Sequence, residues 1–289
     1  MTSITHGGIA ETRQYNALYQ LTRITVAGQM DLEYRYSATA NNGQITQMKN
    51  WMTGEEVNYS YDAVGRLTAA ATTGVEWGLT FTYDGFGNKT GQGVTKGSGP
   101  AMSVGVDGSN RVVGWTYDAA GFPTAVAGQY TSMNWDAQGR MQGITAQAGN
   151  TDNFVYDTGN RRVWRNNQLH LRGVDGKVVA LFNYNSVAQT FDFVDAYAWF
   201  AGRKVGQKED RLGTVQNGSR FYPYGEESAS TGNDKEKFAT YWRDSNTGLD
   251  YAVNRYYKAN VGRFRSPAIL RTAQYTVAPS VLFDARCRC

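Results

Sequence analysis

The stretch WGLTFTYDGFGNKT, residues 77–90, joins a strand pattern to a tight turn. Apolar and aromatic residues alternate with small or polar ones over its first eight positions, which is typical of a half-buried β-strand. Gly85, Gly87 and Asn88 follow, and these residue types tolerate the positive φ of a chain reversal. A phosphate-binding loop is disfavoured, because the glycine spacing is wrong and no helix pattern follows.

The Tyr-Asp pair of this stretch recurs along the first half of the chain, most clearly in Tyr61-Asp-Ala-Val-Gly-Arg-Leu67. Weaker copies begin at Tyr15, Tyr36 and Val106, and most copies start 18 to 25 residues apart. This spacing accommodates two strands and two turns, so each unit is predicted to be a β-hairpin. The residues assigned to the motif are Tyr61, Asp62, Gly65, Arg66, Tyr83, Asp84, Tyr117, Asp118, Gly121, Trp135, Asp136, Gly139, Tyr156 and Asp157.

Each residue of the motif has a structural interpretation. The aromatic residue ends the incoming strand on its buried face, and the aspartate accepts hydrogen bonds from amides of the turn. The glycine takes the positive-φ corner, and the arginine packs its stem beside a neighbouring ring while its head stays in water. A catalytic aspartate would not be copied into every hairpin, so we interpret the pair as a turn device.

The composition predicts an all-β fold with few short helices. The 289 residues include 33 glycines, 19 tyrosines and 7 tryptophans, a mixture that favours short strands and tight turns. Only residues 234–242 suggest a short helix. Single hairpins are marginal in water, so we expect the units to pair edge to edge in one long, twisted, spiralling antiparallel sheet. Such a sheet, a partial β-shell, is expected to curl around a cavity.

Charge and cysteine content argue against several functional classes. The net charge of +4 is mild and the basic residues are scattered, so no nucleic-acid partner is expected. No apolar run reaches the length of a membrane span, and MTSITHGGIA lacks the features of a secretory signal. This favours either a cytoplasmic protein or the end of a longer one. Cys287 and Cys289 give no disulfide framework, and no metal or other cofactor is predicted.

A second block lies beyond the repeats, and it includes Asp210-Arg-Leu-Gly-Thr-Val215, Arg243-Asp-Ser-Asn-Thr-Gly-Leu-Asp-Tyr251 and Gly262-Arg-Phe-Arg-Ser-Pro267. The repeats over residues 15–165 resemble the YD repeats of Rhs proteins, which also occur in insecticidal toxin complexes and teneurins. The second block resembles the Rhs repeat-associated core, and it is the more specific of the two. Its matching residues are Asp210, Gly213, Arg243, Asp244, Gly248, Leu249, Tyr251, Arg255, Tyr256, Tyr257, Gly262, Arg263, Phe264 and Pro267.

The resemblance implies four segments: repeats over 1–165, further shell strands over 166–209, the core over 210–268 and an atypical, disordered tail over 269–289. It also implies a hollow β-shell that the core closes at one end. In this family the shell encloses a C-terminal polymorphic domain, commonly a toxin, until a secretion system or the cell surface delivers it. The implied partners are therefore cargo and a delivery apparatus, and the implied location is secreted or at the cell surface.

The sequence departs from the family after Ser266-Pro267, where Ala268 follows. The aspartyl self-cleavage site of many members begins there with Asp-Pro, and neither that motif nor its Asp-Pro-x-Gly-Leu type end is present. The resemblance therefore implies a shell and a core without cleavage residues or a toxin domain. A truncated, frame-shifted or orphan member is the interpretation that follows.

Several polar residues have competing interpretations. Asp244 and Asp250 form a conceivable carboxylate pair, but capping of the turn at Gly248 is favoured. Glu226-Glu227 is predicted to face solvent. Asp195 interrupts an aromatic stripe, and we expect it to face a polar cavity.

Arg243, Arg255 and Arg263 lie among aromatic residues in the sequence, and their guanidinium groups are predicted to stack on ring faces. Binding of nucleic acid or sugar by the same residues is the less favoured alternative. His170 is a lone strand histidine without a nucleophile motif.

The functional hypothesis is a non-enzymatic encapsulating shell with no catalytic, cofactor-binding or metal-binding residues. The alternative is a surface module whose aromatic and arginine-rich face binds carbohydrate or another cell-surface molecule. A self-cleaving protease comes third, because the Asp-Pro motifs are missing.

Overall fold

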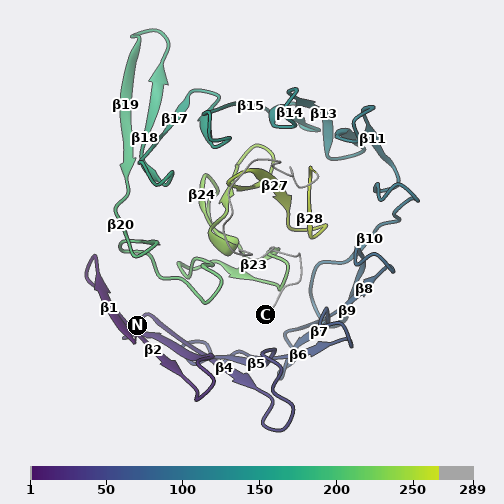
Figure 1. The fold of residues 1–289 in the computed structure, drawn as a ribbon, viewed down its shortest axis with the longest axis vertical. Helices are drawn as coiled ribbons and strands as arrows, with labels where there is room; N and C mark the ends of the chain where they lie inside the picture. The colour runs from purple at the N-terminus through teal and green to yellow at the C-terminus, as the bar shows by residue number, and fades with distance from the viewer. Residues whose placement is uncertain (1, 267–289) are drawn as a thin grey trace, which may run out of the picture.

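The computed structural model describes residues 2–266, and antiparallel strands form nearly all of the regular structure in this range (Figure 1). Two large sheets contain their strands in chain order, so each strand pairs with its neighbour in the sequence. The all-β fold predicted from the sequence is confirmed. The first sheet has ten strands: β1 (Ser3–His6), β2 (Ile9–Tyr15), β3 (Leu21–Val26), β4 (Met30–Tyr36), β5 (Ile45–Asn50), β6 (Glu56–Tyr61), β7 (Leu67–Thr72), β8 (Trp77–Tyr83), β9 (Lys89–Gly97) and β10 (Met102–Ser103).

The second sheet repeats this arrangement. It has nine strands, again in chain order. They are β11 (Trp115–Tyr117), β12 (Pro123–Val126), β13 (Tyr130–Trp135), β14 (Met141–Ala146), β15 (Thr151–Tyr156), β16 (Arg162–Arg165), β17 (Gln168–Arg172), β18 (Val178–Asn185) and β19 (Thr190–Ala196).

Strand β8 shows why these sequences form one-sided strands. Trp77, Leu79 and Phe81 are buried, whereas Thr80 and Thr82 between and beside them are exposed. The period-two pattern of the sequence therefore separates an inner, apolar face from an outer, polar one. Leu79 has no exposed surface, and burying a side chain of this size stabilises the fold by about 1.5–3 kcal/mol.

The pairing register shifts directly before the aromatic residue of each repeat. One strand of the pair carries an extra residue there, which is a β-bulge, and bulges increase the local twist of a sheet. The curvature of the sheet is therefore introduced at an equivalent position of every unit. The shifts lie at Gln14/Tyr15, Arg35/Tyr36, Ser60/Tyr61, Thr82/Tyr83, Thr116/Tyr117, Asn134/Trp135 and Val155/Tyr156.

The two sheets together form a ring-shaped wall, and the C-terminal strands lie inside it (Figure 1). We call β1–β19 the wall and residues 210–266 the inner segment. A short hairpin connects them, and the inner segment itself contains two small sheets and one 3₁₀ turn. These elements are β20 (Trp199–Phe200), β21 (Arg203–Lys204), β22 (Arg220–Phe221), β23 (Glu227–Ala229), β24 (Lys235–Glu236), η1 (Phe238–Thr240), β25 (Trp242–Arg243), β26 (Asp250–Ala252), β27 (Arg255–Lys258) and β28 (Arg263–Phe264).

Apolar side chains join the inner segment to the wall in two clusters. In the first sheet, Trp77 and Phe81 pack with Tyr222 and Tyr224 of the inner segment. A larger cluster combines strands β12–β18 with the inner segment, and its members are Val126, Tyr130, Met133, Met141, Ile144, Ala146, Phe154, Leu181, Trp242, Leu249, Tyr251 and Tyr256. These two clusters of the hydrophobic core therefore lie between the wall and the inner segment.

Three details differ from the sequence-based expectations. The wall curls as expected, but the inner segment occupies the interior seen in Figure 1, and the cavity between it and strands β4–β8 measures about 110 Å³. The helix expected over 234–242 is only the 3₁₀ turn η1, because its flanks pair as β24 and β25. Asp195 is exposed to solvent rather than lining a cavity, although its partner Leu181 places it on the inner face of the sheet. Within residues 2–266, no helix has the length and apolar character to cross a bilayer.

Candidate functional site: the contact between wall and inner segment

Each repeat turn is held by its aspartate. In the turn after β6, Asp62 Oδ1 accepts hydrogen bonds from the amides of Val64 at 3.1 Å and Arg66 at 2.8 Å, and Oδ2 accepts one from Arg66 Nε at 2.6 Å. Desolvation opposes the charge, but the bonds from the Arg66 amide and guanidinium outweigh it and lower the pKa of the Asp62 carboxyl. Gly65 has a φ of 85°, which favours glycine. The Asx-type turn expected from the sequence is therefore present.

The same turn recurs around the wall and once in the inner segment. Asp210 Oδ1 accepts the amides of Leu212 and Thr214, each at 2.8 Å, so the start of the core motif is geometrically another repeat turn. This equivalence was not predicted from the sequence, although the spacing from Asp210 to Gly213 matches that from Asp62 to Gly65. The other aspartates that accept an amide four residues ahead are Asp84, Asp107, Asp118, Asp136 and Asp157.

The aromatic residue of each repeat binds the preceding repeat. Tyr83 Oη donates to the carbonyl of Leu67 at 2.6 Å, where Leu67 is the first residue of the preceding outgoing strand. Trp135 uses its indole nitrogen in the same way. These bonds satisfy the polar end of a largely buried ring and fix the distance between units. The donors and acceptors of this kind are Tyr36 to Leu21, Tyr61 to Ile45, Tyr83 to Leu67, Tyr117 to Val112, Trp135 to Pro123 and Tyr156 to Met141.

The arginine of a repeat turn lies over the aromatic ring of the next repeat. The guanidinium carbon of Arg66 is 4.8 Å from the centroid of Tyr83, and that of Arg140 is 5.3 Å from Tyr156. Such cation–π contacts at exposed sites contribute about 0.5–1 kcal/mol each. The neighbouring ring expected beside the arginine is therefore the one of the following unit, so successive turns are linked along the wall.

A buried ion pair connects the second sheet to the inner segment. Arg162 Nη1 donates to Asp244 Oδ2 at 2.6 Å and Nη2 donates to Oδ1 at 2.9 Å, and neither side chain has exposed surface. Desolvation lowers the pKa of Arg162, but the Asp244 carboxylate outweighs it and the pKa lies above its usual value. Arg165 reaches the same carboxylate at 3.6 Å. The turn-capping interpretation of the Asp244 side chain is therefore wrong, because the side chain turns away from Gly248 toward the wall arginines.

Asp250 and Glu227 together bind one arginine. Arg243 forms two hydrogen bonds of 2.7 Å to the carboxylate of Asp250 and one of 3.1 Å from Nη1 to Glu227 Oε2. Asp250 is thus not a turn cap, and it is not paired with Asp244 as a catalytic dyad. Glu226 is also buried, and its Oε1 accepts from Gln92 Nε2 of the wall at 2.9 Å. The solvent-facing position predicted for Glu226-Glu227 is wrong, because both carboxylates have partners that are distant in sequence.

Other residues of the core motif form contacts of aromatic rings with backbone carbonyls and with arginine side chains. Tyr257 Oη donates to the carbonyl of Tyr224 at 2.8 Å, and Leu249 has no exposed surface. Arg255 lies 3.8 Å from the centroid of Phe264, and Arg243 lies 5.9 Å from Phe221, as the stacking interpretation predicts.

Arg263 is placed differently from its stacking prediction. Its Nη2 instead reaches the carbonyl of Asn110 in the wall at 3.5 Å. Pro267 and the tail over 269–289 lie outside the described residues.

The first strands of the wall meet the segment that follows β19 at a polar seam. Arg203 Nη1 donates to Glu11 Oε1 at 2.9 Å, and the amide of Gly206 donates to His6 Nδ1 at 3.0 Å. Glu209 Oε2 lies 3.4 Å from Arg203 Nη2. Burial, together with the carboxylates of Glu236, Asp210 and Glu11, raises the pKa of Glu209 to about 7. The seam is held by side chains and not by strand pairing between β1 and β19.

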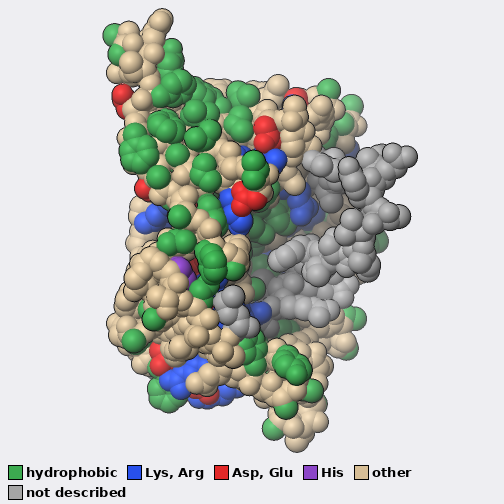
Figure 2. Space-filling view, turned by 60° about the vertical axis from the view of Figure 1, so that its left-hand side comes forward, with side chains coloured by type: hydrophobic (Ala, Val, Ile, Leu, Met, Phe, Trp, Pro, Cys, Tyr) green, Lys and Arg blue, Asp and Glu red, His purple; other side chains and the backbone are tan. Residues whose placement is uncertain are grey.

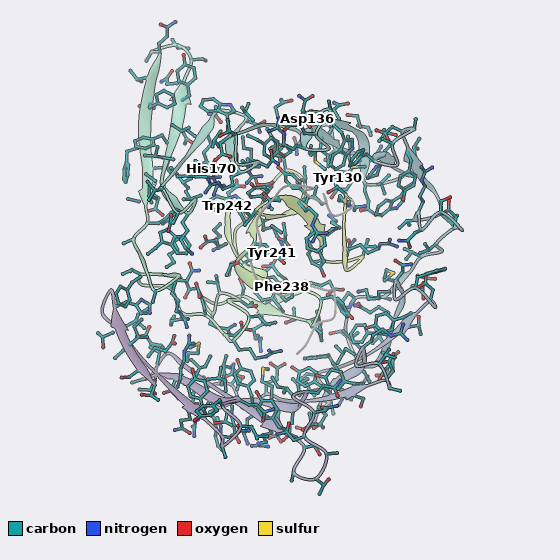
Figure 3. All side chains as sticks on the ribbon, viewed as in Figure 1. Tyr130, Asp136, His170, Phe238, Tyr241 and Trp242 are labelled. Carbon is teal, nitrogen blue, oxygen red and sulfur yellow. The ribbon has the colours of Figure 1, made fainter. Side chains whose placement is uncertain are left out.

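The chemistry of this contact is structural. Asp244 and Asp250 are bound to arginines, and within residues 2–266 no group of three or more histidine, cysteine, aspartate and glutamate side chains has the geometry of a metal site. Burial and the nearby Arg162, Arg172 and Arg165 lower the pKa of His170 well below its usual value. Its ring packs edge to face on Trp242, with the ring centroids 5.2 Å apart (Figure 3). His170 therefore serves as a neutral side chain of the contact.

Residues 1–189 match the family described as Teneurin YD-shell. The chain belongs to the teneurin YD-shell family. Two curated proteins are also similar: the tRNA3(Ser)-specific nuclease WapA of Bacillus spizizenii, 26% identical over 87% of this chain, and the tRNA nuclease WapA of Bacillus subtilis, 24% identical over 87%. The YD-shell chain spans only 10% of the length of each.

Solved structures share the fold of this YD-shell chain. The TcdB2–TccC3–Cdc42 crystal structure matches 91% of it with 18% identity and a TM-score of 0.66. The Photorhabdus luminescens Tc holotoxin pore matches 90% with 19% identity and a TM-score of 0.68. The YD-shell chain covers 17% of each matched chain. The resemblance to Rhs and YD-repeat proteins read from the sequence is thereby confirmed.

Proposed function

We propose that this YD-shell chain is a non-enzymatic part of an encapsulating shell that keeps a cargo polypeptide away from solvent. We assign the repeats over 1–165 and the further strands over 166–209 to the shell, and the Rhs-type core over 210–268 to the closure of its interior. The cargo is a toxin or another polypeptide supplied by the longer protein or by a partner. Delivery by a secretion apparatus or display at a cell surface completes the proposed role.

One observation carries this proposal: the wall turns its aromatic, apolar face inward and binds the inner segment through fully buried charges. Arg162 and Asp244 link the two parts across 82 positions of sequence, and Tyr130 Oη donates to the carbonyl of Thr247 at 2.7 Å. Buried charges without partners are very unfavourable, so arrangements that separate this pair are disfavoured. A wall with an anchored inner closure suits containment, whereas a carbohydrate-binding surface requires exposed rings.

The similar proteins support the same proposal. Two of them are described as tRNA nucleases, and the structures with this fold are described as Tc toxin components. The YD-shell chain matches a small part of each, and the matched part is wall and inner segment. We infer that the chain contributes the container rather than the toxic activity, and that no self-cleavage site operates within it.

Protection of a cargo from protease tests the proposal. The gene is expressed with its flanking coding sequence, and a polypeptide that co-purifies with the shell is digested before and after mild denaturation. We expect this polypeptide to resist protease until the shell opens, and to be cleaved under native conditions when Asp244→Asn weakens the contact between wall and inner segment. Arg23→Gln, a change in an exposed ion pair of the outer face, is the matched control and should leave protection intact. Equal cleavage rates with and without the shell would contradict the proposal.

A further inference from the structure

The outer face of the second sheet is apolar over strands β16–β19, in contrast to that of the first sheet. The outer face of the first sheet carries charged rows in which Arg23 lies opposite Glu33 and Arg35 binds Glu33 at 2.7 Å. On the second sheet, apolar side chains occupy the corresponding side of strands β16–β19, away from the inner segment. Their inward neighbours, such as His170 and Leu181, are buried. We call the outward residues the aromatic patch: Trp164, Leu169, Phe182, Tyr184, Phe191 and Phe193.

The strand register aligns these side chains in a continuous row. Trp164 lies opposite Leu169, Leu169 opposite Phe182, and Phe182 opposite Phe193. Ring centroids are 5.8 Å apart for Phe182 and Phe193 and 5.2 Å apart for Tyr184 and Phe191. Phe193 is nevertheless 63% exposed. Figure 2, which brings this side of the ring forward, shows hydrophobic side chains gathered at and below the projecting hairpin. Exposed apolar patches of this kind mark interaction sites.

The row ends at the open edge of the sheet. Strand β19 is the last strand of the second sheet and pairs only with β18, so its other edge has no strand partner within residues 2–266. All seven of its residues, Thr190–Ala196, are exposed. The hairpin of β18 and β19 projects beyond the ring (Figure 1). An open edge next to an apolar row offers both backbone hydrogen bonds and side-chain contacts to one further strand.

We propose that β19 is a docking edge for an extended strand of a different polypeptide, one that alternates apolar with basic residues. The apolar side chains of this strand continue the row at Phe191 and Phe193. Its basic side chains lie on the opposite face, next to Asp192 and Asp195. Within the wall, β17 shows how a strand continues the row: it pairs with the other edge of β18 and places Leu169 opposite Phe182.

The charged residues of β19 favour a strand of another polypeptide over a second copy of this chain as the binding partner. Asp192 pairs with Asn183 and Asp195 pairs with Leu181 across β18, which places both carboxylates on the face opposite the aromatic patch. Pairing of two β19 edges would bring four exposed carboxylates together on one face of the combined sheet. Like charges on neighbouring strands are destabilising, whereas lysine or arginine opposite these aspartates is stabilising. The edge is therefore suited to a basic strand.

Peptide binding to the full 289-residue chain tests this proposal. The probe is a fluorescent synthetic peptide of alternating leucine and lysine, and fluorescence anisotropy reports its binding. Two control peptides accompany it: one of alternating leucine and glutamate, and a leucine–lysine peptide methylated on its backbone nitrogens. We expect binding of the first peptide and at least about tenfold weaker binding of both controls, because strand addition needs backbone donors as well as charge.

Variants of exposed residues locate the site. Phe193→Ser should weaken binding of the leucine–lysine peptide by about tenfold. Asp192→Lys should reverse the preference between the leucine–lysine and leucine–glutamate peptides. Phe86→Ser removes a still more exposed ring, 91% exposed, at a distant turn and should change nothing. Circular dichroism spectra confirm that each variant is folded before binding is compared.

Three results would overturn the proposal. Equal binding of the methylated and unmethylated peptides would show adhesion without strand addition. Retained affinity in Phe193→Ser would place the peptide elsewhere. A dimer in sedimentation velocity that dissociates in Phe193→Ser would show that a second copy, and not a foreign strand, occupies β19.

Discussion

The guanidinium of Arg162 and the carboxylate of Asp244 form a two-point ion pair, at 2.6 and 2.9 Å, with both side chains fully buried between wall and inner segment. Removing one partner leaves the other charged and unpaired in the interior. We expect Asp244→Ala to lower the free energy of unfolding by about 3–5 kcal/mol, and Asp31→Ala in the exposed pair with Arg23 by no more than about 1 kcal/mol. Urea denaturation measures both.

A double variant separates the ion pair from the packing around it. Replacing Arg162 by Met and Asp244 by Leu removes both charges together and should be much less destabilising than Asp244→Ala. A double variant as unstable as the single one would contradict this explanation and would point to lost volume rather than an unpaired charge.

Two glycines of one turn give a matched test of backbone conformation. Gly87 has a φ of 88°, and no atom lies within 4 Å of the place that an added methyl group would take. Gly85 is also in open space but does not have a positive φ. Gly87→Ala is expected to destabilise the protein by about 1 kcal/mol through strain alone. Gly85→Ala is expected to be neutral or slightly stabilising. Thermal unfolding of the two variants compares them, and equal shifts would refute the assignment of the corner to Gly87.

The ring-to-carbonyl hydrogen bonds between repeats predict that two tyrosine variants lose stability to different extents. Tyr61→Phe removes the hydrogen bond to the carbonyl of Ile45, at 2.9 Å, and should lower stability by about 1 kcal/mol. Tyr83→Phe should cost more, because the Tyr83 hydroxyl binds both the carbonyl of Leu67 and the hydroxyl of Tyr224. Chemical denaturation of both variants checks the order, and a reversed order would mean that the link to Tyr224 contributes nothing.

Glu209 lies in the seam between the first strands of the wall and the segment after β19, and it should make the stability of the protein depend on pH. Its pKa is raised from 4.5 to about 7 in the folded protein, so the folded state holds the proton more tightly than the unfolded state. This contribution to stability is present at pH values below about 4.5 and is lost as the pH rises through about 7. We therefore expect wild-type protein to lose stability relative to Glu209→Gln across this window. Unfolding measured at several pH values tests it, and a constant difference would exclude this role of Glu209.

Local geometry was predictable because it depends on residues close in sequence. Asp62 binds amides two and four positions ahead, and the alternation in β8 separates buried Leu79 from exposed Thr80. The partners of Asp244 were not predictable, since a strand pattern gives the face of a residue but not what covers that face. The surroundings of Asp195 were not predictable for the same reason: the register places it on the inner face, opposite Leu181, but β19 is exposed there.

Because a bulge precedes the aromatic residue of each unit, the circumference of the wall depends on the number of units. Each unit adds a similar angular step, so the number of units determines where the last strand arrives relative to the first. At the present count, Arg203, which follows the last strand of the wall, meets Glu11. Deleting or duplicating a single hairpin would therefore move Arg203 away from Glu11 by the width of one unit. We infer that a change in the number of units must be accompanied by a new contact between the two sides of the seam.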